Sequence, residues 1–124
     1  MPGWFQTELM GLLARLLSLV IGRPTQQRSP DAQRQVDAAT SMLSLYQFSA
    51  CPYCIRVRRV IRKLQLNIEL RDAAGNPAFQ QELKLYGGKL QTPCLRIEQG
   101  EGEAQWLYES SAIIQYLKTR FSIT

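Results

Sequence analysis

From residue 41 onward, the chain alternates between short apolar runs and amphipathic segments, which predicts strands and helices in turn. Residues 43–48 form an apolar run with the length of a buried strand. Residues 52–66 have a helical pattern, and Pro52 suits the first turn of that helix. Apolar and polar residues alternate over 67–71, so this segment predicts a second strand.

The rest of this region predicts a second helix, a hairpin and a final helix. Gly87-Gly88 ends the second helix, Pro93 precedes the hairpin, and Ser110 is suited to cap the final helix. We expect the second helix at residues 76–86, the two hairpin strands at 94–98 and 104–108, and the final helix at 111–120. The element order is β-α-β-α-β-β-α, an α/β fold with the first two strands parallel and an antiparallel hairpin.

The N-terminal segment WFQTELMGLLARLLSLVI, at positions 4–21, has the pattern of an amphipathic helix. Arg15 in its middle disfavours a membrane-spanning helix. A signal peptide would carry positive charge before the apolar stretch and a small-residue cleavage site after it, and neither is present. We therefore expect residues 1–22 to bind a membrane interface, a partner or the protein's own core.

Residues 23–40 are mostly polar and contain Pro24 and Pro30, which indicates a linker with a short helical turn over 31–39. The predicted organisation is therefore an amphipathic helix over 1–22, a linker over 23–40 and a single domain over 41–124.

Composition excludes several classes of function. The chain has 124 residues, a net charge of +5, three cysteines and no histidine. A structural zinc site usually needs four Cys or His ligands, and hydrolases with an imidazole base need histidine, so we expect no metal site and neither of these catalytic arrangements. The mild positive charge suits an anionic small molecule or a membrane surface, and no motif indicates nucleic acid.

The segment Cys51-Pro52-Tyr53-Cys54 follows the first expected strand and begins the first expected helix. Two cysteines at this spacing can close and reopen a disulfide, and a helix N-terminus favours the thiolate that attacks disulfides. The helix also carries a run of basic residues without an acidic residue between them, which adds a positive field, although most such runs are solvated helix faces. The run consists of Arg56, Arg58, Arg59, Arg62 and Lys63.

Over residues 42–121 the chain resembles the glutaredoxin branch of the thioredoxin fold. The resemblance rests on Cys51-Pro52-Tyr53-Cys54, on Thr92-Pro93 before the third strand, and on Gly87-Gly88 before it. The segment from Tyr108 to Ile113 resembles the Glu-Ser-x-Ala-Ile segment of glutathione transferase N-terminal domains. The lead-in 45–48 also resembles a prostaglandin E synthase branch of this group. The implied architecture is a three-layer thioredoxin-like fold.

The resemblance implies a role for each residue of the site. Cys51 is the expected nucleophile and Cys54 the resolving thiol. Pro93 is expected in a cis peptide bond that presents the backbone of Thr92 to the cysteinyl part of glutathione. Alternatively, Pro93 is an ordinary proline at the start of a strand. Five further residues are expected around glutathione: Glu109 and Ser110 at its γ-glutamyl end, Tyr53 beside the sulfur, and Lys89 and Gln91 at the glycyl carboxylate. Ser110 is otherwise only a helix cap.

Cys94 is the third cysteine, and it begins an expected strand. We interpret Cys94 first as a buried, small apolar residue. The alternatives are a regulatory thiol and a further disulfide partner for Cys51 or Cys54. Three positions depart from the glutaredoxin pattern: Phe48 replaces a basic residue, Thr92 replaces valine, and Glu109-Ser110 replaces a Gly-Cys-Asp-Asp segment. These differences concern the binding of glutathione more than the thiol chemistry.

The implied function is that of a glutathione-dependent thiol–disulfide oxidoreductase, which reduces protein–glutathione mixed disulfides and protein disulfides. Glutathione is its co-substrate, no cofactor is tightly bound, and its partners are glutathionylated or disulfide-containing proteins. A cytoplasmic location is expected, with membrane association through residues 4–21. The alternatives are a transferase-like or isomerase-like enzyme, which would usually carry a helical second domain that these 124 residues lack, and a tethered module that binds glutathionylated partners.

Overall fold

The computed structural model describes residues 27–122, whose centre is a four-stranded sheet with the strand order β2-β1-β3-β4. The strands are β1 (Leu43–Gln47), β2 (Glu69–Asp72), β3 (Cys94–Glu98) and β4 (Ala104–Tyr108). As expected, β1 and β2 are parallel, and β3 and β4 form an antiparallel hairpin. Strand β3 also pairs antiparallel with β1, which joins the two halves of the sheet.

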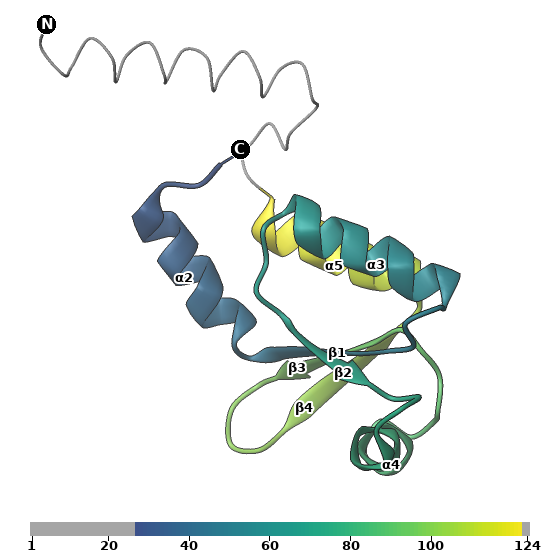
Figure 1. The fold of residues 1–124 in the computed structure, drawn as a ribbon. Coiled ribbons are helices and arrows are strands. Elements are labelled where there is room, and N and C mark those ends of the chain that lie inside the picture. The colour runs from purple at the N-terminus through teal and green to yellow at the C-terminus, as the bar shows by residue number, and fades with distance from the viewer. Residues whose placement is uncertain (1–26, 123–124) are drawn as a thin grey trace, which may run out of the picture.

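Helices cover both faces of this sheet (Figure 1). Helices α3 (Pro52–Lys63) and α5 (Ser110–Phe121) lie side by side on one face, and the short helix α4 (Pro77–Leu85) lies on the other. Asn76 caps α4, because its side chain accepts hydrogen bonds from the backbone N–H groups of Ala78 and Phe79. The result is the three-layer, thioredoxin-like architecture that the sequence predicted.

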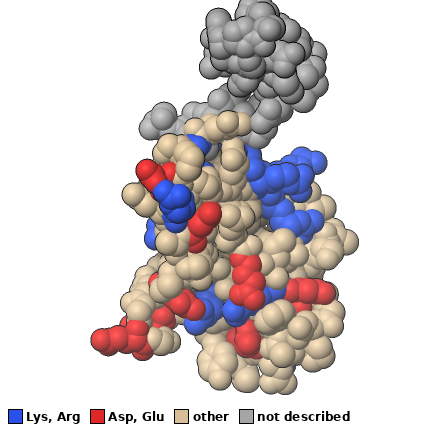
Figure 2. Space-filling model, turned by 60° about the vertical axis from the view of Figure 1, so that its left-hand side comes forward, with Lys and Arg blue, Asp and Glu red and all other residues tan. Residues whose placement is uncertain are grey.

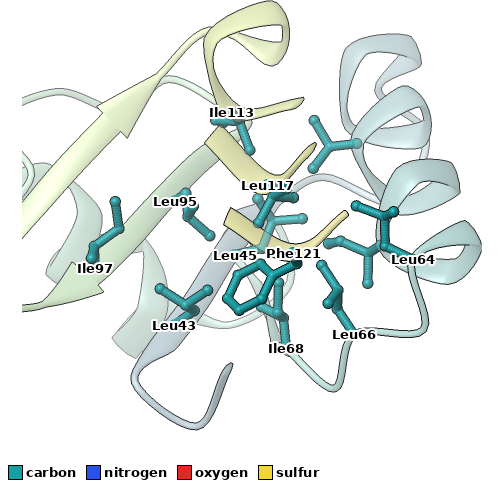
Figure 3. Close-up of a cluster of buried hydrophobic side chains, with 12 residues drawn as sticks. Leu43, Leu45, Leu64, Leu66, Ile68, Leu95, Ile97, Ile113, Leu117 and Phe121 are labelled. Atoms are coloured by element: carbon teal, nitrogen blue, oxygen red, sulfur yellow. The ribbon is translucent and has the colours of Figure 1, made fainter. Parts of the chain in front are cut away.

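The main hydrophobic core lies between the sheet and the helices α3 and α5 (Figure 3). Successive residues of a strand point to opposite faces, so Leu43 and Leu45 of β1 enter this core together with Leu95 and Ile97 of β3. Helix α5 contributes residues at helical spacing, namely Ile113, Leu117 and Phe121. This packing fixes both helices relative to the strands, and therefore fixes the loops at their ends.

The opposite face of the sheet holds a smaller cluster that packs against α4. Tyr46 lies at its centre, 1% exposed, with Leu83 and Cys94 also buried. The Tyr46 hydroxyl donates to Glu82 at 2.7 Å, and Arg71 donates to the same hydroxyl at 2.7 Å. Burial is the main reason that the pKa of Tyr46 is raised to about 12.

Residues 30–40, expected to belong to a linker, form the helix α2 (Pro30–Thr40). Ser29 caps it by accepting a hydrogen bond from the N–H of Ala32, and Val36 and Ala39 pack against the main core. The helical segment expected over 31–39 extends by one residue at each end. Contacts with distant carbonyl groups hold it in place: Arg28, just before the helix, donates to the carbonyls of Leu64 and Phe121, and Gln33 donates to that of Gln65.

Strands β3 and β4 have the expected bounds, and several other boundaries differ from the expected ones by one to three residues. Helix α3 ends at Lys63 rather than at residue 66, and β2 begins at Glu69 rather than at residue 67. The expected amphipathic helix over residues 1–22, and with it the proposed membrane or partner contact, lies outside the described residues. Within residues 27–122, no helix has the length and apolar character required to cross a membrane.

Candidate active site

The register of the sheet brings three separate segments to one of its ends. Tyr46 pairs with Cys94, and Cys94 pairs with Tyr108. The end of β1, the start of β3 and the end of β4 therefore lie next to one another. The loop to Cys51, the Thr92-Pro93 segment and residue Glu109 all leave the sheet at this end.

Cys51 occupies the N-cap position of α3. Its backbone N–H donates to the carbonyl of Phe48 at 3.2 Å, and its own carbonyl accepts from Ile55 at 3.0 Å. These bonds fix the residue between the end of β1 and the first turn of the helix. Cys51 is only partly buried, which leaves the residue accessible to a substrate.

The pKa of Cys51 is lowered below its ordinary value. Burial by itself acts in the opposite direction, but hydrogen bonding from the backbone of Cys54 and Tyr53 and from the side chains of Cys54 and Thr92 outweighs it. The direction of this shift does not need the basic residues of α3. A thiolate at Cys51 is therefore favoured, as the reactive cysteine of a redox pair requires.

Cys54 differs from Cys51 in both exposure and acidity. Its side chain is fully buried, and this burial is the main reason that its pKa is raised. Hydrogen bonding from the backbone of Phe48 and from Thr92 acts against the increase, and the neighbouring Cys51 reinforces it. No disulfide joins the two cysteines in this structure. The pair thus consists of one accessible, acidic thiol and one enclosed, neutral thiol.

Thr92 connects the start of β3 with both cysteines, because its side chain hydrogen-bonds to each sulfur. The Thr92–Pro93 peptide bond is cis, the geometry that the sequence resemblance implied. Tyr53 is 58% exposed, and it lies beside Cys51 in the first turn of α3. The structure thus brings together Cys51, Tyr53, Cys54 and Thr92.

Glu109 and Ser110 follow β4 directly and begin α5. The expected cap is shifted by one residue: Glu109 occupies the N-cap position without a side-chain capping bond, and Ser110 is the first helical residue. Glu109 is exposed and has a φ of 74°, whereas Ser110 is 7% exposed. The carboxylate is therefore free to meet a ligand at the helix N-terminus.

Lys89 and Gln91 lie in the exposed loop that precedes Thr92. The Lys89 ammonium group sits over the ring of Tyr108, 4.6 Å from its centroid, and Gln91 N–H donates to the Lys89 carbonyl at 3.1 Å. Among the described residues, no hydrogen bond joins either side chain to the cysteines. Their expected role at the glycyl carboxylate remains a prediction.

The sequence reasoning missed Tyr108 as an organiser of this loop. Its hydroxyl bonds to the carbonyls of Gly87 and Lys89, both at 3.0 Å. A Cβ at Gly87 would lie 2.6 Å from the Tyr108 hydroxyl and from the Leu83 carbonyl, so only glycine fits there. A tyrosine at the end of a strand gives no sequence signal for such a contact.

Cys94 is fully buried beside Tyr46 on the α4 side of the sheet. Burial raises its pKa to about 11, so its thiol is neutral at physiological pH. This environment supports the interpretation of Cys94 as a buried apolar residue. It does not suit a reactive thiol.

A polar hollow between β4, β3 and α4 is not lined by any of the cysteines. It encloses about 490 Å³, and its lining includes Arg71 and Arg96, which form ion pairs with Glu82 and Glu98. None of the site residues that the sequence predicted lines it. Within residues 27–122, no group of three or more Cys, Asp or Glu side chains is arranged to hold a metal ion.

Comparison with known proteins identifies relatives of this chain. Residues 45–123 match the family model described as the glutathione S-transferase N-terminal domain. Prostaglandin E synthase 2 from Mus musculus is 32% identical over 99 residues, which cover 75% of this chain and 25% of the relative. The homologous protein from Danio rerio is also 32% identical, over 89% of this chain and 27% of its own length. The chain thus spans about a quarter of these relatives.

Solved structures show the same fold. The trimeric glutathione transferase TDR1 of Leishmania matches with a TM-score of 0.53 and 28% identity, over 64% of this chain and 18% of that one. Glutathione transferase Omega 2C from Trametes versicolor matches with a TM-score of 0.51 and 20% identity, over 64% of this chain and 37% of that one.

Proposed function

Because the chain belongs to the glutathione S-transferase N-terminal domain family, we propose that it is a glutathione-dependent thiol–disulfide oxidoreductase with Cys51 as its nucleophile. The observation that carries this proposal is the asymmetry of the two cysteines. Cys51 is accessible and its pKa is lowered, whereas Cys54, one helical turn away, is buried and its pKa is raised. Disulfide exchange begins with attack by a thiolate, which Cys51 can supply, and a second thiol can then resolve the mixed disulfide.

In the proposed reaction, the Cys51 thiolate attacks the glutathione sulfur of a protein–glutathione mixed disulfide. The bond between the two substrate sulfurs breaks, and the protein thiolate leaves and takes a proton. Cys51 is then joined to glutathione. A second glutathione thiolate attacks the glutathione sulfur of this adduct, which forms glutathione disulfide and restores the Cys51 thiolate.

A second route uses Cys54. Its thiol loses a proton and attacks the sulfur of Cys51, which releases glutathione and leaves a disulfide between Cys51 and Cys54. Two glutathione molecules then reduce this disulfide and become glutathione disulfide. The hydrogen bond between the two side chains supports this route, because it places the sulfurs next to each other.

Glutathione binding is assigned to the groups around Cys51. The backbone of Thr92 pairs with the cysteinyl part of glutathione, as an added strand would. Glu109 binds its α-amino group, and the N-terminus of α5 at Ser110 binds its α-carboxylate. Tyr53 flanks the sulfur, while Lys89 and Gln91 lie on the loop that would meet the glycyl carboxylate.

The test is glutathione-dependent reduction of a mixed disulfide between glutathione and a small thiol, with Cys51→Ser, Cys54→Ser and the control Cys94→Ser. Loss of activity only in Cys51→Ser indicates the route through a second glutathione, and loss in both Cys51→Ser and Cys54→Ser indicates the dithiol route. Full activity in Cys51→Ser, or none in the unchanged protein, contradicts the proposal.

The second candidate is a transferase-like or isomerase-like enzyme that uses bound glutathione as the nucleophile. The names of its relatives, prostaglandin E synthase 2 and a glutathione transferase, favour it. In that case glutathione conjugation or isomerisation would persist in Cys51→Ser, because the attacking sulfur would belong to glutathione.

A further inference from the structure

The two helices that cover the main core carry only positive charge. Neither α3 nor α5 contains an aspartate or a glutamate. Their basic residues are Arg56, Arg58, Arg59, Arg62 and Lys63 on α3, and Lys118 and Arg120 on α5. Acidic residues of the described chain lie on other elements or, for Glu109, at the N-cap of α5.

Most of the cations on α3 form a single solvent-facing stripe. At 100° per residue, the side chains of Arg56, Arg59, Arg62 and Lys63 fall within about 120° of the helix circumference. All four are exposed, and the stripe lies opposite the buried residues Cys54, Val57 and Ile61. We call these four residues the α3 basic face.

Cations elsewhere in the described part of the chain are often paired. Arg71 forms ion pairs with Glu69 and Glu82, and Arg96 with Glu98. Among residues 27–122, no member of the α3 basic face forms an ion pair. Figure 2 shows both situations: a group of Lys and Arg atoms without red atoms among them, and red and blue atoms side by side lower down.

The α3 basic face has a fixed position relative to Cys51. The helix that carries it begins at that residue, and Arg58 ties the helix to the preceding loop by donating to the Ser49 carbonyl at 3.0 Å and to the side chain of Gln47. Arg56 lies about 7 Å along the axis from Cys51, and the face then extends about 10 Å further. An extended segment of three or four residues would cover that length.

We propose that the α3 basic face binds an acidic segment of the protein substrate, next to the cysteine whose mixed disulfide Cys51 attacks. The inference rests on the proposed function and names its substrate class. Like charges at helical spacing repel one another, so carboxylates bound there relieve an unfavourable arrangement. Complementary charge also accelerates encounter and orients the substrate.

An acidic polypeptide fits this surface better than an anionic membrane does. A lipid surface lying along α3 would also cover Tyr53 and Cys51 at the start of the helix, where the substrate must enter. A polypeptide can lie on the same stripe and still place its own cysteine at Cys51.

The test compares two glutathionylated peptides of equal length, with four glutamates or four glutamines beside the cysteine. The full chain, the double variant Arg59→Glu/Lys63→Glu and the control Arg34→Glu/Lys84→Glu are assayed at low salt. Both variants change the net charge equally, but Arg34 and Lys84 lie on α2 and α4. We expect about a three- to tenfold higher kcat/KM for the acidic peptide in the full chain and the control, and loss of this preference in the α3 variant.

The small mixed disulfide separates this inference from the proposed function. All three proteins should reduce the small mixed disulfide at the same rate. If the unchanged protein does not reduce it, the proposed function itself is contradicted. Binding of the acidic peptide with serine in place of cysteine, followed by fluorescence anisotropy, then still tests the surface. Equal kcat/KM for both peptides, a preference unaffected by the α3 variant, or α3-dependent binding only to anionic lipid vesicles would overturn the inference.

Discussion

The side chain of Thr92 hydrogen-bonds to the sulfur of Cys51, although the two residues belong to different layers of the molecule. Thr92 precedes the central strand β3, and Cys51 begins the helix α3 that covers the sheet. Burial alone would raise the pKa of Cys51. The contact with Thr92 is one of the hydrogen bonds that outweigh burial and lower the pKa. The acidity of the thiol therefore depends on how the sheet and the helix are packed.

Replacement of Thr92 by valine should raise the pKa of Cys51, because it removes a hydroxyl donor and keeps a similar shape. The rate of Cys51 alkylation by iodoacetamide at pH 6, followed by mass spectrometry, should fall about two- to fivefold. Thr92→Ser retains the hydroxyl and serves as the control. Equal rates in the valine and serine variants would show that the hydroxyl does not stabilise the thiolate.

Cys94 should make the stability of the protein depend on alkaline pH. Its folded pKa of about 11 lies above the ordinary thiol value of about 8.5, because burial disfavours the thiolate. The folded state holds the proton more tightly, so this contribution to stability is complete below the unfolded pKa and is lost as pH rises towards the folded pKa. The total loss is about 3 kcal/mol.

Urea unfolding under reducing conditions at pH 7, 9 and 10 measures this effect. Cys94→Ala should show a smaller decrease in unfolding free energy between pH 7 and 10 than the unchanged protein. The comparison uses the slope with pH, since the smaller side chain lowers stability at every pH. Parallel curves for the two proteins would mean that Cys94 ionises as easily in the folded state as in the unfolded state.

Arg28 joins the C-terminal ends of two helices. Its guanidinium group donates to the carbonyl of Leu64 at 2.6 Å and to that of Phe121 at 2.5 Å. Arg28→Ala should lower the free energy of unfolding by about 1–3 kcal/mol, because both carbonyls lose a charged donor. The exposed Arg34, paired with Asp31, is the control, and Arg34→Ala should cost less than about 1 kcal/mol. Similar costs for both variants would exclude a special role for Arg28.

Glu109 has a backbone conformation that favours glycine, with a φ of 74°. Glu109→Gly should therefore keep or increase stability, while the loss of the carboxylate raises KM for glutathione. Glu101 in the hairpin turn, with a φ of 50°, provides the matched control. Glu101→Gly should have the same effect on stability and none on KM, and an unchanged KM in Glu109→Gly would remove Glu109 from the binding site.

The sequence predicted the elements whose boundaries depend on local chemistry. Strands β3 and β4 have the expected bounds, because Pro93 precedes the first and Gly100 and Gly102 form the turn between them. The position of the two thiols at the start of α3 also follows from local sequence, because Cys51-Pro52-Tyr53-Cys54 lies between an expected strand and an expected helix. These features follow from residues that are neighbours in the chain.

Contacts between distant segments could not be predicted in the same way. Helix α2 has a capping serine and a proline in its first turn, but it is held by Arg28 and by Gln33, whose amide donates to the Gln65 carbonyl at 3.0 Å. The hydrogen bonds of Tyr108 to the loop before β3 depend on the register of the sheet. The contact of Thr92 with both cysteines also requires the packed structure, because the sequence shows only that Thr92 precedes Pro93.

The identity of the sulfur that carries glutathione tests the central claim most directly. Cys54→Ser is mixed with a glutathionylated peptide, quenched with acid and digested, and the modified cysteine is located by mass spectrometry. We predict one glutathione per chain, attached to Cys51. Glutathione on Cys94 instead, or a Cys51 that stays unmodified while the peptide is reduced, would contradict the account.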